Sequence, residues 1–189
     1  MEAFLVSVAV VALAEIGDKT QLLALVLAAR YRRPVPIIFG ILTATLVNHF
    51  AAGALGAWLT QVIGPSAMRW ILGVSFIAMA GWTLIPDKFE QQKEPPARLG
   101  VYGATVLSFF VLEMGDKTQI ATIALTAKYH ALVQVVAGTT VGMMLADVPA
   151  VLLGEVAAKK LPMKLLQRIA AALFFVLGVV VLLHNPAAD

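Results

Sequence analysis

Glu15-Ile16-Gly17-Asp18-Lys19-Thr20-Gln21 is the stretch around which this chain is organised, because it places charged and polar side chains inside an otherwise apolar segment. The stretch returns 98 residues later as Glu113-Met114-Gly115-Asp116-Lys117-Thr118-Gln119, with one conservative change. An internal repeat of this kind predicts a molecule built from two related halves, each of which carries one copy of the motif.

The composition indicates an integral membrane protein. Of the 189 residues 60% are hydrophobic and 13% are charged, and the mean hydropathy is +0.89. In soluble domains roughly a quarter of the residues are charged. The chain has no cysteine, which excludes disulfides and thiolate metal sites. Its net charge of +3 comes from basic residues in short loops between apolar segments, which favours membrane orientation signals over a nucleic-acid partner.

Apolar segments bounded by charges, prolines and glycines predict six membrane-spanning helices, three in each half. The first, Phe4 to Ala29, would span about 39 Å as one continuous helix, enough for a hydrocarbon core of roughly 30 Å. The predicted spans are Phe4 to Ala29, Pro36 to Val62, Met68 to Ile85, Gly100 to Ala127, Leu132 to Ala157 and Leu165 to Leu183. The fold class is therefore all-α.

Residues 1–86 and 99–189 form the two predicted three-helix repeats, and the only hydrophilic segment, 87–98, is the linker between them. Small residues coincide at the same offset, as in Gly40 and Gly138. Gly138 and Gly142 also form a GxxxG pattern, which lets helices approach closely in lipid. These small-residue faces allow a homodimer without requiring one.

An odd number of spans in each repeat predicts that the second repeat enters the membrane from the opposite side. With both termini outside, the inside loops hold ten basic residues and the outside loops only two. This asymmetry places the 87–98 linker in the cytoplasm. Inverted repeats of this type are the architecture that secondary transporters use for alternating access, with the site where the repeats meet.

On a continuous helix, Glu15 and Asp18 would lie on one face, as would Glu113 and Asp116. Packing of the first span against the fourth would gather these carboxylates and two amides near the middle of the membrane. Such a cluster cannot stay fully ionised and empty, so it would hold protons or a cation. The predicted metal ligands are Glu15, Asp18, Gln21, Glu113, Asp116 and Gln119.

The ligand types favour a hard or borderline divalent cation. Carboxylate and amide oxygens, with no cysteine or histidine in the motif, suit calcium, magnesium and manganese and are poor ligands for copper or zinc. The four acids and the two motif lysines together leave a charge that one divalent ion would balance. Competition between that ion and protons for the same carboxylates is the physical requirement for cation/proton antiport.

The remaining motif residues have two interpretations each. Lys19 and Lys117 either pair with a carboxylate of their own helix or extend toward water, and we expect a role in gating or charge balance. Gly17 and Gly115 either break the helix locally or, as the commoner use, permit close packing. In the second and fifth spans, Asn48 and His49 align with Ala146 and Asp147. Asp147 is a candidate proton carrier or accessory ligand, whereas His49 has the character of a hydrogen-bonded interior histidine.

The two motif copies resemble the duplicated E-x-G-D-[KR]-[ST] motif of the Gdt-type cation/proton exchangers, and the resemblance covers nearly the whole chain. It implies transport of Mn²⁺ or Ca²⁺ with protons as the counter-ion, and binding by Glu15, Asp18, Glu113 and Asp116. The compact chain looks most like the bacterial manganese exporters, which implies the bacterial plasma membrane. No cofactor other than the transported ion is expected.

Two other classes of function compete with transport. An intramembrane metalloenzyme would need an open metal position and a nucleophile or activated water. The chain has no HExxH motif and no serine or cysteine in the acidic motif, so we expect that it is not an enzyme. The other class is a non-transporting cation sensor or structural protein, in which the acidic motifs form a cation-dependent clamp between helices.

Overall fold

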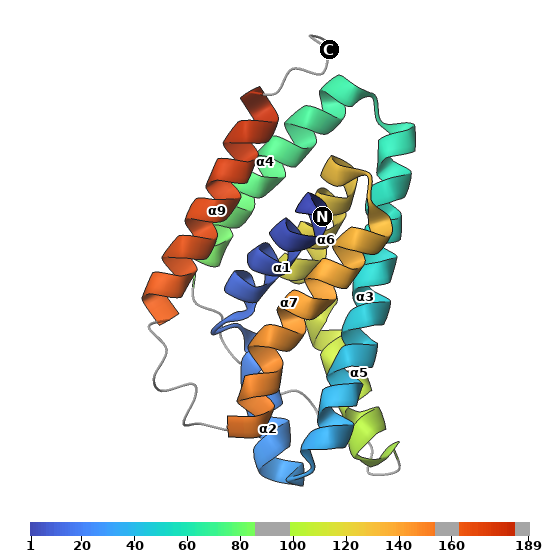
Figure 1. The fold of residues 1–189 in the computed structure, drawn as a ribbon, viewed down its shortest axis with the longest axis vertical. Helices are drawn as coiled ribbons and strands as arrows, with labels where there is room; N and C mark the ends of the chain where they lie inside the picture. The colour runs from blue at the N-terminus through green and yellow to red at the C-terminus, as the bar shows by residue number, and fades with distance from the viewer. Residues whose placement is uncertain (86–98, 154–162, 184–189) are drawn as a thin grey trace.

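The structure, a computed structural model, describes residues 1–85, 99–153 and 163–183. In these three ranges the chain is all-helical, as the sequence predicts (Figure 1). The helices are α1 (Glu2–Glu15), α2 (Lys19–Tyr31), α3 (Pro34–Val62), α4 (Pro65–Thr83), α5 (Gly100–Glu113), α6 (Lys117–Tyr129), α7 (Leu132–Leu153) and α9 (Met163–Leu183). The predicted linker 87–98 and the last predicted residues of the fifth span lie outside the described residues.

The first and fourth predicted spans are not continuous helices. Each is divided at the motif: α1 ends at Glu15 and α2 begins at Lys19, while α5 ends at Glu113 and α6 begins at Lys117. Gly17 and Gly115 have φ angles of 84° and 79°, a conformation that the right-handed helix excludes. The expectation that the glycines serve only close packing is therefore wrong, and their conformation is what breaks the helix.

Three described helices are long and apolar enough to cross a membrane by length and composition: α3, α7 and the segment Leu165–Leu183 of α9. The 19-residue helix α4 is not among them. The outer face of α3 exposes large apolar side chains, including Phe39, Phe50 and Trp58. Apolar side chains exposed in rows suit contact with lipid rather than water.

Close glycine contacts hold α7 against α1 and α3 against α5, and both crossings use equivalent residues. A Cβ atom added at Gly138 would lie 2.5 Å from the Phe4 carbonyl oxygen and 2.8 Å from the Ser7 side chain. One added at Gly40 would lie 2.7 Å from the Thr105 side chain. Gly138 follows Gly40, and Thr105 follows Ser7, by the same 98 residues. The predicted close approach at these small residues is confirmed.

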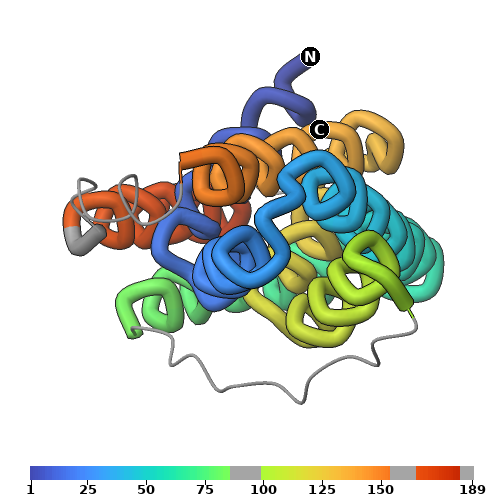
Figure 2. Tube along the Cα trace, turned by 90° about the horizontal axis from the view of Figure 1, so that it is seen from below, coloured from blue at the N-terminus to red at the C-terminus, as the bar shows by residue number. Residues whose placement is uncertain are grey.

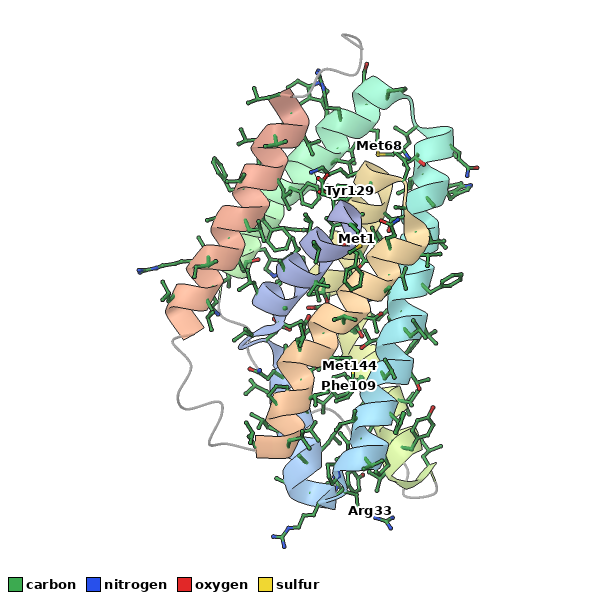
Figure 3. All side chains as sticks on the ribbon, in the orientation of Figure 1. Met1, Arg33, Met68, Phe109, Tyr129 and Met144 are labelled. Carbon is green, nitrogen blue, oxygen red and sulfur yellow. The ribbon has the colours of Figure 1, made fainter. Side chains whose placement is uncertain are left out.

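Two apolar clusters lie on either side of the helix breaks. One contains residues of α1, α4, α6 and α9, including Met68 and Val10, with Tyr129 packed against it. The other contains residues of α2, α3, α5 and α7, including Phe109, with Met144 packed against it. Figure 3 shows Met68 and Tyr129 toward one end of the molecule and Phe109 and Met144 toward the other. The polar motif residues therefore lie in a layer between two apolar layers.

The arrangement of helices follows from these contacts. Helices α4 and α9 pack along each other on one flank, while α1 lies between α7 and α9. In Figure 1, α1 and α6 occupy the upper half and α2 and α5 the lower half, so each motif marks the change from one half to the other. Figure 2 looks onto the lower end, where α2, α3 and α5 lie together.

Candidate cation site at the two helix breaks

Both motif copies form the same turn. Ile16 has φ −64° and ψ 114°, Gly17 has a positive φ, and the Asp18 N–H donates to the Glu15 carbonyl at 3.0 Å. This is a type II turn, which requires glycine at its third position. Met114, Gly115 and the 3.0 Å bond from Asp116 N–H to the Glu113 carbonyl repeat it. The turn ends one helix and starts the next in three residues.

Asp18 and Asp116 occupy the N-cap positions of α2 and α6. Aspartate is a preferred N-cap residue because its side chain can bond the free N–H groups of the first turn. Neither carboxylate makes such a capping bond here. Both side chains are instead directed to partners on other helices, within reach of the positive N-terminal ends of α2 and α6.

The motif glutamines complete the turns. Gln21 Oε1 accepts a hydrogen bond of 2.9 Å from the Gly17 N–H, and Gln119 Oε1 accepts one of 2.7 Å from the Gly115 N–H. The Gln21 amide also donates to the Ala146 carbonyl at 3.1 Å, which joins α2 to α7. In this conformation both amide oxygens are bound to the backbone, whereas the sequence predicts them as metal ligands. The geometry gives them a structural task.

Three motif carboxylates converge. Glu15, Asp18 and Asp116 each offer an oxygen, and these atoms all lie within 4.8 Å of one another. All three side chains are buried. They come from the end of α1 and from the starts of α2 and α6, so both motif copies contribute. The cluster contains only oxygen ligands, the type that hard divalent cations prefer.

The two motif lysines pair across the copies. Lys19 Nζ lies 2.8 Å from Asp116 Oδ1, and Lys117 Nζ lies 2.7 Å from Asp18 Oδ1. The sequence predicts either pairing with a carboxylate of the same helix or extension toward water, and the turn gives each lysine a partner in the other copy. These crossed pairs join the two halves of the chain at the centre of the molecule.

Glu113 has a different environment from its counterpart Glu15. The His49 Nε2 atom on α3 lies 2.7 Å from Glu113 Oε1, and both side chains are fully buried. The Asn48 amide donates to Glu113 Oε2 at 3.4 Å and to the Phe110 carbonyl at 3.2 Å. Glu113 is not part of the group of three converging carboxylates. The structure thus brings three of the four predicted acids together and holds the fourth against α3.

Asp147 on α7 occupies the position that corresponds to His49, and it is also fully buried. Neither of its carboxylate oxygens has a hydrogen-bond partner among the described residues. It lies close enough to Glu15, Asp18 and Glu113 to interact with them electrostatically. Glu15 accepts a hydrogen bond from the Thr20 hydroxyl through one oxygen, and its other oxygen is without such a partner in the described part of the chain.

Sequence reasoning did not identify the tasks of Thr20 and Asn48, which support Glu15 and Glu113 respectively. The position of Thr20 could have indicated this contact. It lies two residues after the N-cap aspartate, in the first turn of the helix, and its hydroxyl is therefore next to the break where Glu15 ends the preceding helix. The partner of Asn48 carried no local signal, since it is 65 residues away in the sequence.

Comparison with known proteins identifies relatives of this chain. A family model described as divalent cation/proton antiporter GDT1 matches it twice, over residues 3–91 and 101–189. A protein of Vibrio cholerae named "Putative manganese exporter" is 49% identical over 94% of this chain and 89% of its own length. GDT1-like protein sll0615 of Synechocystis is 29% identical over 95% of this chain and 96% of its own length.

GDT1-like protein 5 of Arabidopsis thaliana is 28% identical over 95% of this chain and 94% of its own length. No solved structure matches the chain significantly. The family is one of transporters, and with the long apolar helices it identifies an integral membrane protein. The two matches of the family model together cover nearly the whole chain. The chain therefore belongs to the GDT1 family of divalent cation/proton antiporters.

Proposed function

We propose that this chain is a secondary active transporter that exports Mn²⁺ from the cell in exchange for protons, with Ca²⁺ as the alternative substrate. The observation that carries the proposal is the group of buried carboxylates from Glu15, Asp18 and Asp116 at the junction of the two motif copies. Buried carboxylates of this kind are costly in a membrane and mark ion pathways.

The ligand chemistry and the relatives support manganese. An all-oxygen group suits Mn²⁺, Mg²⁺ and Ca²⁺ better than copper or zinc. The relative with 49% identity is named "Putative manganese exporter". Protons are the natural counter-ion, because a proton and a metal ion compete for the same carboxylate oxygens.

The transport cycle follows from the two apolar clusters on either side of the site. In the described residues both clusters separate the carboxylates from the molecular surface, so the conformation is closed around the site. Opening one cluster at a time would expose the carboxylates to one side of the membrane at a time. The crossed pairs Lys19–Asp116 and Lys117–Asp18 join the parts that would move, which gives the lysines their gating role.

The architecture in this proposal is two inverted three-helix repeats, residues 1–86 and 99–189, with motif helices that are broken at mid-membrane. The repeated glycine crossings and the double match of the family model support it. Discontinuous helices around a central ion site are a recurring feature of such transporters. The proposed location is the bacterial plasma membrane, with both termini outside and the 87–98 linker in the cytoplasm.

Single cysteines test this topology, because the chain has none of its own. Arg33, at the lower end of the molecule in Figure 3, and Ala131 differ by 98 residues and lie at equivalent turns. Inverted repeats predict that Arg33→Cys reacts with a membrane-impermeant reagent only from the cytoplasmic side and Ala131→Cys only from outside. Reaction of both from the same side would contradict the inverted topology.

A cation-dependent clamp or sensor is the second candidate, because the crossed lysine–aspartate pairs join the two motif copies without requiring transport. Metal flux separates the two candidates. The purified chain is reconstituted in proteoliposomes, and uptake of Mn²⁺ and of Ca²⁺ is followed with and without an imposed pH gradient. The variant Glu15→Gln is compared with Glu2→Gln, which makes the same chemical change at the other end of α1.

A proton-driven Mn²⁺ exporter gives metal flux that rises with the pH gradient, is lost in Glu15→Gln and persists in Glu2→Gln. Flux of Ca²⁺ alone would change the substrate and keep the mechanism. Absence of flux of either ion, from folded protein that still binds Mn²⁺, would reject the transporter and favour the clamp.

A further inference from the structure

Five buried carboxylates and three basic side chains occupy the polar layer between the apolar clusters. Each basic group lies against one carboxylate at 2.7–2.8 Å: Lys19 with Asp116, Lys117 with Asp18, and His49 with Glu113. The remaining carboxylates are Glu15 and Asp147, against which the structure places no basic side chain in its described part. Two buried carboxyl groups thus have no basic side chain against them in the described part of the chain.

Glu15 and Asp147 come from helices that pack tightly together, α1 and α7. Both side chains are 0% exposed, and Asp147 interacts electrostatically with Glu15, Glu113 and Asp18, although it lies outside the group of three converging carboxylates. Asp147 has no hydrogen-bond partner at either oxygen among the described residues, and Glu15 lacks one at Oε1. Buried polar atoms are nearly always satisfied, so an unpartnered pair of carboxylates points to a ligand that supplies the missing charge.

We propose that Asp147 is a direct ligand of the transported divalent cation, opposite Glu15, and that the chain holds one such ion rather than two. His49 closes the corresponding position beside Glu113, where its imidazole takes the place that the cation takes beside Glu15. This inference rests on the proposed function for the identity of the ion and departs from the expectation that both motif copies contribute equal ligand sets.

The charges support a single divalent ion. One doubly charged cation would neutralise the two carboxylates in their ionised form, and Asp18 and Asp116 lie near enough to Glu15 to add oxygens to its shell. Beside Glu113, a second cation would have to displace His49 from a contact of 2.7 Å. The exchange of histidine for aspartate at equivalent positions of α3 and α7 therefore makes the two half-sites unequal.

Direct Mn²⁺ binding to the purified chain tests the proposal without transport. Titration calorimetry on protein freed of metal by a chelator is expected to give one Mn²⁺ per wild-type chain. Asp147→Asn keeps the side-chain shape and removes the charge, and it is expected to lower affinity about 100-fold, as Glu15→Gln does. Glu113→Gln and the control Glu2→Gln are expected to change affinity by less than about 10-fold.

A second variant pair keeps the test independent of folding defects in any single variant. Asp147→His should abolish binding, because it places a basic group beside Glu15. Adding His49→Asp to it exchanges the two positions and should restore one Mn²⁺ per chain. Binding in that double variant should then depend on Glu113 and no longer on Glu15.

Each outcome bears on one proposal. Two Mn²⁺ per wild-type chain, or wild-type affinity in a folded Asp147→Asn variant, would overturn this inference whatever the flux shows. One Mn²⁺ per chain that is lost in Asp147→Asn would uphold it, even if proteoliposomes showed no flux and the transporter proposal failed.

Discussion

The half-site around Glu15 and the half-site around Glu113 share a backbone and differ in what faces them. Both glutamates end a helix at a type II turn, followed by an N-cap aspartate and a glutamine that bonds back to the turn. Glu113 contacts His49 and Asn48, whereas no basic side chain is placed against Glu15 among the described residues, and Asp147 lies near enough to interact electrostatically with both glutamates. The comparison indicates that the repeated sequence builds the framework, and that unrepeated residues on α3 and α7 decide where a cation can bind.

The largest expected effect concerns stability without metal. His49→Leu leaves Glu113 buried without its basic partner, which should lower the free energy of unfolding by about 3–5 kcal/mol. Asp147→Asn removes a carboxylate that already has no partner among the described residues, so stability should stay the same or rise. Unfolding in detergent with a chelator present measures both. A loss in Asp147→Asn equal to that in His49→Leu would break the comparison.

Stabilisation by Mn²⁺ should separate the two glutamates. At a free concentration about 100 times the dissociation constant, a ligand that binds only the folded state adds about 2.7 kcal/mol. We expect most of this gain in the wild type and in Glu113→Gln, and only about 0.4 kcal/mol in Glu15→Gln at the same concentration, because its affinity is about 100-fold lower. The measurement is the unfolding transition with and without Mn²⁺. Equal losses in both variants would show that both half-sites hold the ion.

The two motif glutamines should also differ. Gln21→Leu leaves the Gly17 N–H and the Ala146 carbonyl without their partner, and we expect a loss of about 2–3 kcal/mol of unfolding free energy. Gln119→Leu removes one bond, to an exposed N–H, and should cost about 1 kcal/mol or less. Unfolding of the two variants side by side provides the measurement. A larger loss for Gln119→Leu would contradict this difference.

The smallest expected effect tests the feature that both half-sites share. Gly115→Ala places a side chain at φ 79°, where its Cβ would meet no atom within 4 Å, so only the backbone strain of about 1–2 kcal/mol should appear. Gly81→Ala in α4 also meets nothing within 4 Å but lies within a helix, and should be stabilising by about 0.5–1 kcal/mol. A lower unfolding temperature for Gly115→Ala and a higher one for Gly81→Ala would support the turn. Shifts in the same direction would contradict it.

The sequence predicted the repeat, the helical class and the burial of the acids, because acidic side chains inside apolar segments are costly in lipid and face the protein interior. It also held the signals of the break: glycine at the third turn position, aspartate as N-cap and glutamine three residues later all fit the observed turn. The prediction of one continuous span through each motif followed hydropathy instead, and hydropathy is the same for one long helix and for two short ones.

The partners of the charged groups could not be predicted in this way. Lys19 has an aspartate next to it in the sequence, and only the packed structure shows that its partner is Asp116. His49 and Asp147 align by offset, but the glutamate that each one faces depends on which helices cross. Those crossings, α3 with α5 and α7 with α1, arise from glycine contacts between the two repeats.

The crossed pairing of lysine and aspartate has a consequence for genetics. Each half of the chain supplies a lysine whose partner is encoded in the other half, 97 codons away for Lys19 and 99 for Lys117. A mutation such as Lys19→Gln should therefore be compensated for folding by Asp116→Asn and not by the adjacent Asp18→Asn. Suppressor mutations selected for restored protein abundance should map to the opposite half of the gene, so a charge change in one half constrains the other.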